Sequence, residues 1–248
     1  ATLVAANLSE EDLTKNRQPD IGLQMHPGRF LVELAETFGP SRRGVWSSWF
    51  ETLDEREEAR EASIAEQAEE ENENSELVSP LYFFQRMDEA MDDDAIIVVD
   101  GGDFVATGAY VLQPRGPMRW LDPGVFGTLG VGGGFALGAG LTRPDSEIWL
   151  VWGDGSSGYS LAEFDTYVRH GLAPIAVVGT DASWAQIERE QVEILGTDLG
   201  CELRKSEYHK VAEGYGGEGI LVDDPDDVDD ALREAKEIAG SGTPVLVN

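Results

Sequence analysis

The chain has 248 residues, of which 41% are apolar, so it can build a hydrophobic core and wholesale disorder is excluded. The single cysteine, Cys201, excludes a disulfide framework and a cysteine-rich zinc site. The formal net charge is −30, from 48 acidic and 18 basic residues, and such a surface repels phosphate backbones and anionic lipids. We therefore expect no nucleic-acid partner and no membrane partner.

The acidic residues are spread along the whole chain, and only four of the basic residues are lysines. We interpret this composition as the solvated surface of a halophilic protein, because concentrated salt screens the repulsion between exposed charges. No apolar run is long enough to span a bilayer, and the start of the chain lacks the basic and apolar regions of a signal peptide. The expected location is therefore the cytoplasm.

The N-terminal stretch predicts one strand and one helix, which is too little for a domain. A short apolar run begins at Thr2, and apolar residues recur at helical spacing from Pro27. We interpret residues 1–40 as the tail of a preceding central α/β domain. Residues 41–77 carry a dense run of acids and predict an acidic helical linker.

From residue 78 onward, apolar runs alternate with helical patterns. The predicted strands cover residues 95–99, 148–152, 174–178, 219–222 and 244–247, and the predicted helices cover residues 80–91, 161–170, 187–195, 208–214 and 225–238, with a glycine-rich stretch that becomes helical over residues 127–141. The strands are apolar throughout, which is typical of strands buried on both faces. Residues 78–248 therefore predict an α/β domain, a parallel sheet covered by helices on both faces.

Three loops follow three of the predicted strands, so we expect them to meet at one edge of the sheet. They begin at Asp100, Gly153 and Gly179, and each combines carboxylates with small residues. Glycines let backbone N–H groups approach an anion closely, and the helix after the second loop directs its N-terminus to the same place. Ligands of such sheets bind beyond the carboxyl ends of the strands, so the pattern favours a phosphate-binding site there.

Two aspartates in these loops are candidate metal ligands. Asp154 and Asp181 lie 27 positions apart, at the ends of neighbouring predicted strands. A protein this acidic needs a cation to hold a diphosphate against its own carboxylates, and Mg²⁺ prefers oxygen ligands. The alternative is that both aspartates only cap helices. The two acids, the Gly-Asp-Gly-Ser loop and the downstream helix together favour a shared Mg²⁺ site.

The loop Gly153–Ser156, followed by Asp181, resembles the thiamine-diphosphate (ThDP) motif of a known enzyme family. In that family the motif opens with Gly-Asp-Gly and closes with Asn, and this sequence has Thr180-Asp181 where the family usually has Asn-Asn. The resemblance implies that ThDP and Mg²⁺ are cofactors. It also implies Asp154, Asp181 and the backbone carbonyl of Ser183 as the metal ligands.

The wider resemblance covers nearly the whole chain. Gly127–Gly130 resembles the family's Gly-Thr-Met-Gly segment, which faces the aminopyrimidine, and Tyr159 falls where the family places a bulky wedge that holds ThDP bent. The segments that begin at Asp122, Glu163 and Trp184 resemble the acetolactate-synthase-like proteins, and the 2-hydroxyacyl-CoA lyases are the nearest branch. The Gly-Met-Val stretch of true acetolactate synthases is missing from the substrate loop. The resemblance implies a carboligase or lyase that makes or breaks a C–C bond next to a carbonyl.

A set of residues follows from the three loops and from this resemblance. The expected cofactor-binding residues are Gly101, Gly102, Asp103, Gly127, Leu129, Gly153, Asp154, Gly155, Ser156, Tyr159 and Asp181. Trp184 directly follows the third loop, and it either lines the substrate pocket or packs in the core.

Family members are longer and carry an upstream pyrimidine-binding domain, whose glutamate activates the cofactor. No part of this chain resembles that domain, so the activating glutamate is expected outside the chain, in a domain lost in cis or in a partner subunit. The acids of the linker are not candidates, because nothing places them at the site. The resemblance further implies a homo-oligomer, a dimer or tetramer, and a small-molecule substrate, either a 2-keto acid or a 2-hydroxyacyl-CoA. The alternative function is a catalytically silent subunit for ThDP binding or assembly.

A dehydrogenase is a weaker interpretation of the glycine-rich stretch. In Gly130–Phe135 the third glycine of the Gly-x-Gly-x-x-Gly fingerprint would fall at Phe135, so the dinucleotide-binding pattern fails. The sequence also has no Gly-x-x-x-x-Gly-Lys phosphate loop.

Overall fold

The computed structural model describes residues 2–38, 44, 46–75 and 77–248. The chain divides into two compact units, Ala1–Ala59 and Arg60–Asn248. The division falls inside the long helix α3 (Ser47–Asn74), whereas the sequence suggested boundaries after residues 40 and 77. The roles assigned to the three stretches of the chain stay a prediction.

The first unit is built on a two-stranded parallel sheet. Strand β1 (Val4–Asn7) pairs with β2 (Ile21–Gln24), and helix α1 (Glu10–Thr14), capped by Ser9, connects them. Helix α2 (Pro27–Phe38) follows. The prediction of one strand and one helix in this stretch was therefore wrong, because α1 and β2 are too short to show a clear hydrophobic period.

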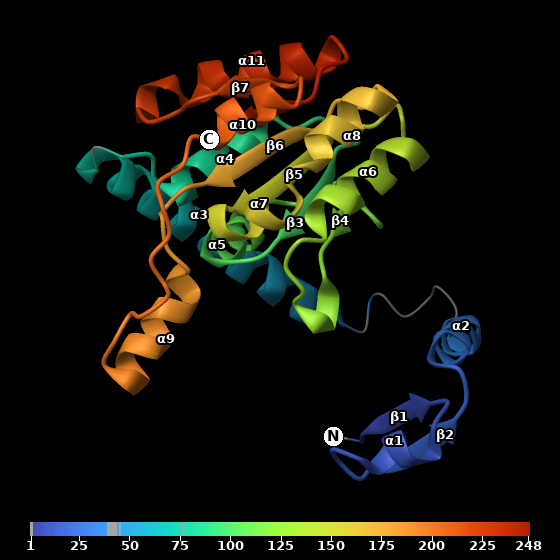
Figure 1. Ribbon diagram of the computed structural model, residues 1–248. Helices are drawn as coiled ribbons and strands as arrows, with labels where there is room; N and C mark the ends of the chain where they lie inside the picture. The colour runs from blue at the N-terminus through green and yellow to red at the C-terminus, as the bar shows by residue number, and fades with distance from the viewer. Residues whose placement is uncertain (1, 39–43, 45, 76) are drawn as a thin grey trace. The chain divides into compact units, whose positions relative to one another are not determined.

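The second unit holds a six-stranded sheet with the order β4-β3-β5-β6-β8-β7, in which every pairing is parallel (Figure 1). Its strands are β3 (Ile96–Asp100), β4 (Trp120–Leu121), β5 (Ile148–Gly153), β6 (Ile175–Gly179), β7 (Glu218–Ile220) and β8 (Val245–Val247). Its α-helices after α3 are α4 (Pro80–Ala90), α5 (Asp103–Val111), α6 (Gly132–Thr142), α7 (Asp154–Ser160), α8 (Glu163–His170), α9 (Ala185–Leu195), α10 (Tyr208–Gly214) and α11 (Val228–Gly240), and two 3-10 turns cover Gly124–Phe126 and Pro225–Asp227.

Helices cover both faces of this sheet. One face packs against α4, α5 and α11 and against Ile64 of α3, and the other packs against α6, α8 and α10. Successive side chains of strand β5 point to opposite faces of the sheet. Trp149 and Val151 belong to the first core and Leu150 and Trp152 to the second, and all four are fully buried. The predicted fold, a parallel sheet covered on both faces, is confirmed.

The order of the strands creates a switch point between β3 and β5. The chain leaves β3 through α5 to β4 at one edge, then returns through α6 to place β5 on the other side of β3. Adjacent strands whose connections leave in opposite directions open a crevice beyond their carboxyl ends, where ligands of α/β proteins bind. The sequence did not predict β4 or α5, since β4 has two residues and α5 follows a glycine loop.

None of the described helices is long and apolar enough to cross a membrane.

Candidate functional site

The three predicted loops meet at the carboxyl edge of the sheet, as expected. They leave β3, β5 and β6, which are neighbours, and the strand ends are in register, with Asp100 opposite Trp152 and Gly153 opposite Gly179. The site is therefore built on three adjacent strand ends, with the β5 loop in the middle.

The middle loop buries one carboxylate. Strand β5 ends at Gly153 and α7 begins at Asp154, whose side chain is only 3% exposed. Its two oxygens accept hydrogen bonds from N–H of Gly155 at 2.7 Å and from N–H of Ala182 at 2.8 Å. Burial, and then the nearby charge of Asp181, raise the pKa of Asp154 above its usual value, although the backbone hydrogen bonds oppose this shift. The carboxylate is thus held in a place that disfavours its charge.

The third loop brings the second aspartate to the same place. Ala182 adopts the left-handed conformation, with φ of 60°, and this turn directs its N–H to Asp154. Asp181 is exposed, and its Oδ1 accepts a hydrogen bond from N–H of Ser183 at 3.0 Å. The hydroxyl of Ser183 donates to the carboxylate of Glu188, at the start of the next helix. Asp154 and Asp181 therefore lie close together at adjacent strand ends.

The first loop is closed over by the glycine-rich segment before α6. Gly101 and Gly102 have φ of 69° and 92°, and a Cβ on Gly101 would lie 1.9 Å from Cδ2 of Leu129. Gly127, in the left-handed conformation, ends the 3-10 turn just before Leu129. The structure thus brings Leu129 onto Gly101, two residues predicted independently for the cofactor site.

A buried aspartate holds this segment in place. The carboxylate of Asp100 is fully buried and accepts hydrogen bonds from N–H of Gly130 at 3.0 Å, from N–H of Gly132 at 2.8 Å and from the indole of Trp152 at 3.3 Å. The hydroxyl of Ser156 donates to the backbone carbonyl of Asp100. Asp100 therefore joins the first loop, the middle loop and the start of α6, and the sequence analysis did not include it among the site residues.

Two predicted aromatic residues flank the middle loop. Tyr159 packs so closely on Gly130 that a Cβ on that glycine would lie 2.7 Å from Cβ of Tyr159, while the side chain of Tyr159 stays 64% exposed. The ring of Trp184 covers Gly155, where a Cβ would lie 2.4 Å from Cζ3. Trp184 is thus half-buried against the site itself.

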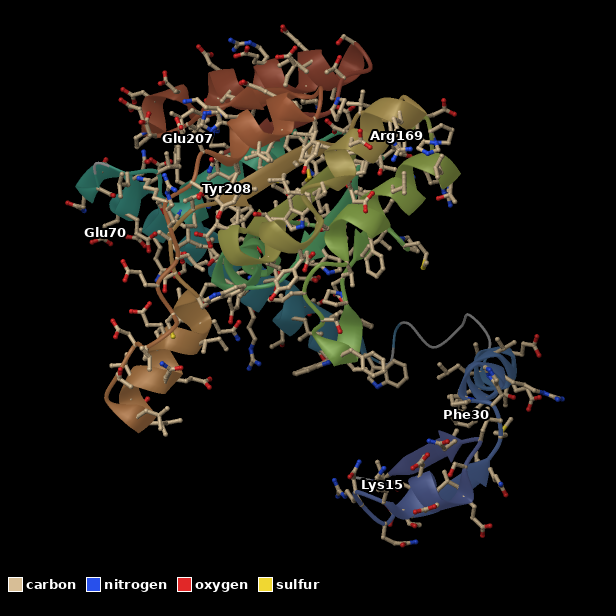
Figure 2. The ribbon with its side chains drawn as sticks, viewed as in Figure 1. Lys15, Phe30, Glu70, Arg169, Glu207 and Tyr208 are labelled. Carbon is tan, nitrogen blue, oxygen red and sulfur yellow. The ribbon has the colours of Figure 1, made fainter. Side chains whose placement is uncertain are left out.

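The sequence analysis missed two further contacts at this edge. Asp103, the first residue of α5, forms a two-point ion pair with Arg189 of α9, and this hydrogen bonding lowers the pKa of Asp103. Tyr208 is the first residue of α10 (Figure 2), and burial first and then the charge of Asp154 raise the pKa of its phenol. Neither contact has a signal in spacing or periodicity, because each joins residues that are distant in sequence.

The site has the donors that a magnesium diphosphate needs. Among the described residues there is no group of three or more His, Cys, Asp or Glu side chains suited to hold a metal ion, so the aspartate pair does not form a closed metal cage. Mg²⁺ is usually held by one or two carboxylates together with substrate phosphates and water. A buried carboxylate beside a like charge is the arrangement that a divalent cation stabilises, so the residues present fit the group.

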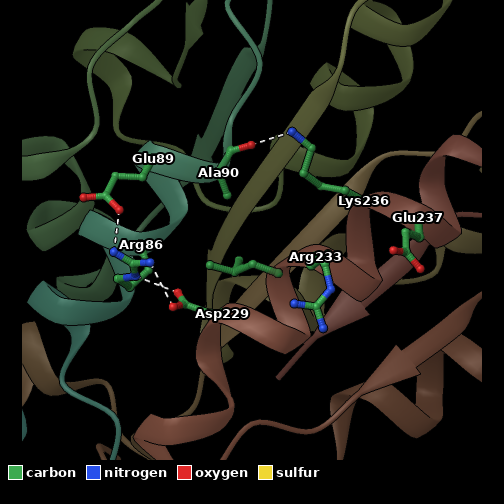
Figure 3. Close-up of a pocket in the computed structure, with 8 residues that line it drawn as sticks. Arg86, Glu89, Ala90, Asp229, Arg233, Lys236 and Glu237 are labelled. Atoms are coloured by element: carbon green, nitrogen blue, oxygen red, sulfur yellow. Dashed lines mark hydrogen bonds and ion pairs between the residues drawn. The ribbon is translucent and has the colours of Figure 1, made fainter.

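Two hollows lie elsewhere on the second unit. One of about 590 Å³ lies between α4 and α11 (Figure 3), lined by Arg86, Glu89, Ala90, Asp229, Leu232, Arg233, Lys236 and Glu237. Another of about 380 Å³ includes Ile148 and Ile175, the first residues of β5 and β6, at the opposite edge of the sheet from the loops. Charged groups of the first hollow pair with one another, as Arg86 does with Asp229 at 2.6 and 2.8 Å. Neither hollow contains the predicted site residues.

Comparison with known proteins agrees with this geometry. A family model described as the thiamine pyrophosphate enzyme, C-terminal TPP binding domain, matches residues 100–248. The 2-hydroxyacyl-CoA lyase 2 of Danio rerio is 45% identical over 99% of this chain and 40% of its own length, and that of Homo sapiens is 43% identical over 99% and 39%. A probable acetolactate synthase of Mycobacterium bovis is 37% identical over 68% of this chain and 30% of its own length.

Solved structures with this fold include that of a thiamine diphosphate-dependent enzyme. The thiamine diphosphate-dependent 4-hydroxybenzoylformate decarboxylase of Rhodococcus jostii superposes with a TM-score of 0.64 at 21% identity, over 70% of this chain and 32% of that one. The chain spans about 40% of the length of the curated lyases it matches. Since the family model covers more than half of the chain, the chain belongs to the thiamine pyrophosphate enzymes, and residues 100–248 form their C-terminal TPP-binding domain.

Proposed function

We propose that the chain binds ThDP and Mg²⁺ through the diphosphate, as one half of an enzyme that breaks or makes a C–C bond next to a carbonyl. The observation that carries the proposal is the buried carboxylate of Asp154 beside Asp181 at the end of β5. Burial and like charge both disfavour the ionised form, and a divalent cation bound between the two carboxylates offsets both effects.

Different residues of the chain would hold the metal ion and the diphosphate. Asp154 and Asp181 would bind Mg²⁺, with the backbone carbonyl of Ser183 as the third protein ligand that the family resemblance implies. Gly101 and Gly102, both with positive φ, let the backbone of the first loop come close to the diphosphate. When bound, ThDP supplies the electron sink for the bond that is broken or formed.

Side chains around the loops would orient the cofactor and exclude water. Leu129 packs against Gly101 of the first loop, and Tyr159 of α7 packs against Gly130, so both side chains border the loops that would hold the cofactor. The ring of Trp184, just before α9, covers Gly155 of the middle loop. A substrate would then enter beside Trp184.

We infer that the substrate is a 2-hydroxyacyl-CoA, cleaved next to its carbonyl. The supporting observation is that relatives named 2-hydroxyacyl-CoA lyase 2 match nearly the whole chain, whereas the acetolactate synthases match 68% of it at 37% identity. The test supplies a 2-hydroxyacyl-CoA or a 2-keto acid to the assembled enzyme. Turnover of the keto acid alone would favour carboligation instead.

The activating glutamate would come from a pyrimidine-binding domain, in cis or in a partner subunit, within a homo-oligomer. The chain spans only about 40% of the curated lyases, which also supports a second candidate, a catalytically silent subunit that binds ThDP. Turnover after addition of a candidate pyrimidine-binding partner separates the two. An enzyme half gains activity, and a silent subunit does not.

The site assignment is tested by calorimetric titration of ThDP in the presence of MgCl₂. Asp154→Ala removes the buried ligand, so affinity should fall by at least about 100-fold. Asp165→Ala is the control, because Asp165 is an exposed acid on α8 that pairs with Arg169 of the same helix. Unchanged magnesium-dependent binding by Asp154→Ala would contradict the proposed site.

A further inference from the structure

Residues 182–203 project from the rest of the second unit as an arm that contains α9, and we call this segment the α9 arm (Figure 1). Its base is closed by backbone hydrogen bonds of 2.8 Å from Leu203 to Ala182 and from Trp184 to Cys201. The base lies directly beside the candidate metal ligands, because Ala182 donates its N–H to Asp154. The base of the arm is therefore continuous with the loop that carries Asp181.

The body of the arm is not held by a hydrophobic core. Helix α9 has no buried residue, and Ile187, Ile194 and Leu195 are more than half exposed. Arg189 links α9 to the rest of the unit, since its Nη1 and Nη2 donate to the two carboxylate oxygens of Asp103, the second at 2.5 Å. A two-point pair of this kind fixes orientation as well as distance.

The Asp103–Arg189 pair joins two helices that follow different strands of the sheet. Asp103 follows β3, and Arg189 follows β6, while β5 lies between these two strands. The pair therefore joins elements that follow the two strands on either side of β5, whose loop begins at Gly153 and carries Asp154. It also places a cation at an edge that already holds four aspartates, at positions 100, 103, 154 and 181.

We propose that Arg189 is a positioning residue that, through Asp103, holds the α9 arm and the metal-ligand loop at its base across the cofactor site and so retains bound ThDP. The inference rests on the proposed function. Opening the pair would release both the first loop, with its glycines, and the arm, so the diphosphate would leave faster. Arg189 acts through Asp103 and needs no contact with the cofactor.

The experiment uses the full chain and two readouts. The first is the rate at which labelled ThDP, bound with Mg²⁺, is released into an excess of unlabelled ThDP. The second is hydrogen exchange at the base of the arm, at the amides of residues 182–184 and 203, without cofactor. Arg189→Gln should speed release by roughly threefold or more and speed exchange at the base, since exposed ion pairs contribute up to about a fivefold effect. The swapped pair, Asp103→Arg with Arg189→Asp, should move exchange at the base back toward the wild-type rate.

A matched control is available on another part of the unit. Arg86 of α4 and Asp229 of α11 also form a two-point ion pair, in which Nε and Nη2 of Arg86 donate to the two carboxylate oxygens. Arg86→Gln should leave both ThDP release and exchange at the base unchanged. An equal effect of Arg86→Gln would mean general loosening of the fold, and would overturn the inference.

The outcomes separate this inference from the proposed function. Wild-type rates of release and exchange in Arg189→Gln would overturn the positioning role while leaving ThDP binding intact. If the wild-type chain binds no ThDP, the proposed function fails, and the retention of ThDP that rests on it fails as well. The exchange readout then still shows whether Arg189 holds the arm.

Discussion

At the level of single residues, the best-satisfied carboxylate of the site is that of Asp100. It lies at the end of β3, fully buried, and three N–H groups from Gly130, Gly132 and Trp152 point at it. If one acceptor oxygen of such a buried carboxylate is replaced, N–H groups that pointed at it are left unpaired, which is costly in a low-dielectric interior.

Asp100→Asn should therefore destabilise the fold by about 2–4 kcal/mol, because the amide presents an N–H group to donors that need an acceptor. Denaturant unfolding measures the change. Asp122→Asn is the control, since Asp122 also accepts from a backbone N–H (Gly124) and from an indole (Trp120) but is exposed. Equal losses in both variants would show that burial is not the cause.

The pKa of Asp154 leads to a second prediction at this scale. A carboxyl group whose pKa is raised in the folded state stabilises the fold in its protonated form, and this contribution is lost as pH rises through the raised pKa. Mg²⁺ binds the ionised form, so magnesium-dependent ThDP affinity should fall as pH is lowered through that same pKa.

Asp181→Asn removes the like charge and keeps an oxygen ligand. It should lower the pKa of Asp154, and so move the pH at which affinity falls to a lower value. Titrations of ThDP and MgCl₂ at a series of pH values measure the midpoint. A midpoint that stays in place would show that burial alone sets the pKa of Asp154.

At the level of elements, α6 is packed against its neighbours through glycines. A Cβ on Gly133 would lie 2.8 Å from the backbone carbonyl of Ser160, and the carbonyl of Gly133 itself accepts a hydrogen bond from the hydroxyl of Tyr167 at 2.7 Å. The helix therefore approaches α7 and α8 at backbone distance. This close approach holds the start of α6, and with it the segment that carries Leu129, beside the site.

Gly133→Ala should destabilise the fold by about 1–3 kcal/mol, because the backbone of α7 must move to admit the methyl group. Gly138→Ala, in the same helix, meets no atom within 4 Å and should be neutral or stabilising by up to about 1 kcal/mol. Thermal unfolding of both variants tests the contrast. A stable Gly133→Ala protein would show that α6 can shift without loss.

At the level of the whole molecule, the main feature is the large negative net charge and its effect on stability. The chain carries a net charge of −30, and ion pairs such as Arg169–Asp165 and Arg233–Asp230 are largely exposed, so they add little stability. Repulsion among the remaining acids opposes the compact state at low salt and is screened at high salt. The halophilic interpretation of the composition stays a prediction.

The midpoint of thermal unfolding should therefore rise by several degrees between dilute buffer and molar KCl. Differential scanning calorimetry at increasing KCl concentrations measures this midpoint, and sucrose serves as the uncharged control solute. A midpoint that responds to sucrose but not to KCl would contradict the role of charge repulsion.

Local patterns were enough to predict much of this protein. The continuous apolar strands predicted a parallel sheet with two covered faces, because each strand must bury both of its sides. The strand-end positions of Asp154 and Asp181 predicted that they meet, because parallel strands end at one edge. Short elements such as β4 and α1 were not predicted, because two to five residues are too few to show a period.

The sequence by itself determined the fold class, the edge of the sheet that carries the site and the motif residues in its loops, since these depend on periodicity and on spacing within a few residues. Only the tertiary structure decided that Asp100 turns inward to bind the segment 30 residues later, and that Asp103 pairs with Arg189, which is 86 residues away. Such contacts depend on how loops from different strands approach one another. That approach is set by the packing of the whole sheet and leaves no mark on the local pattern of either residue.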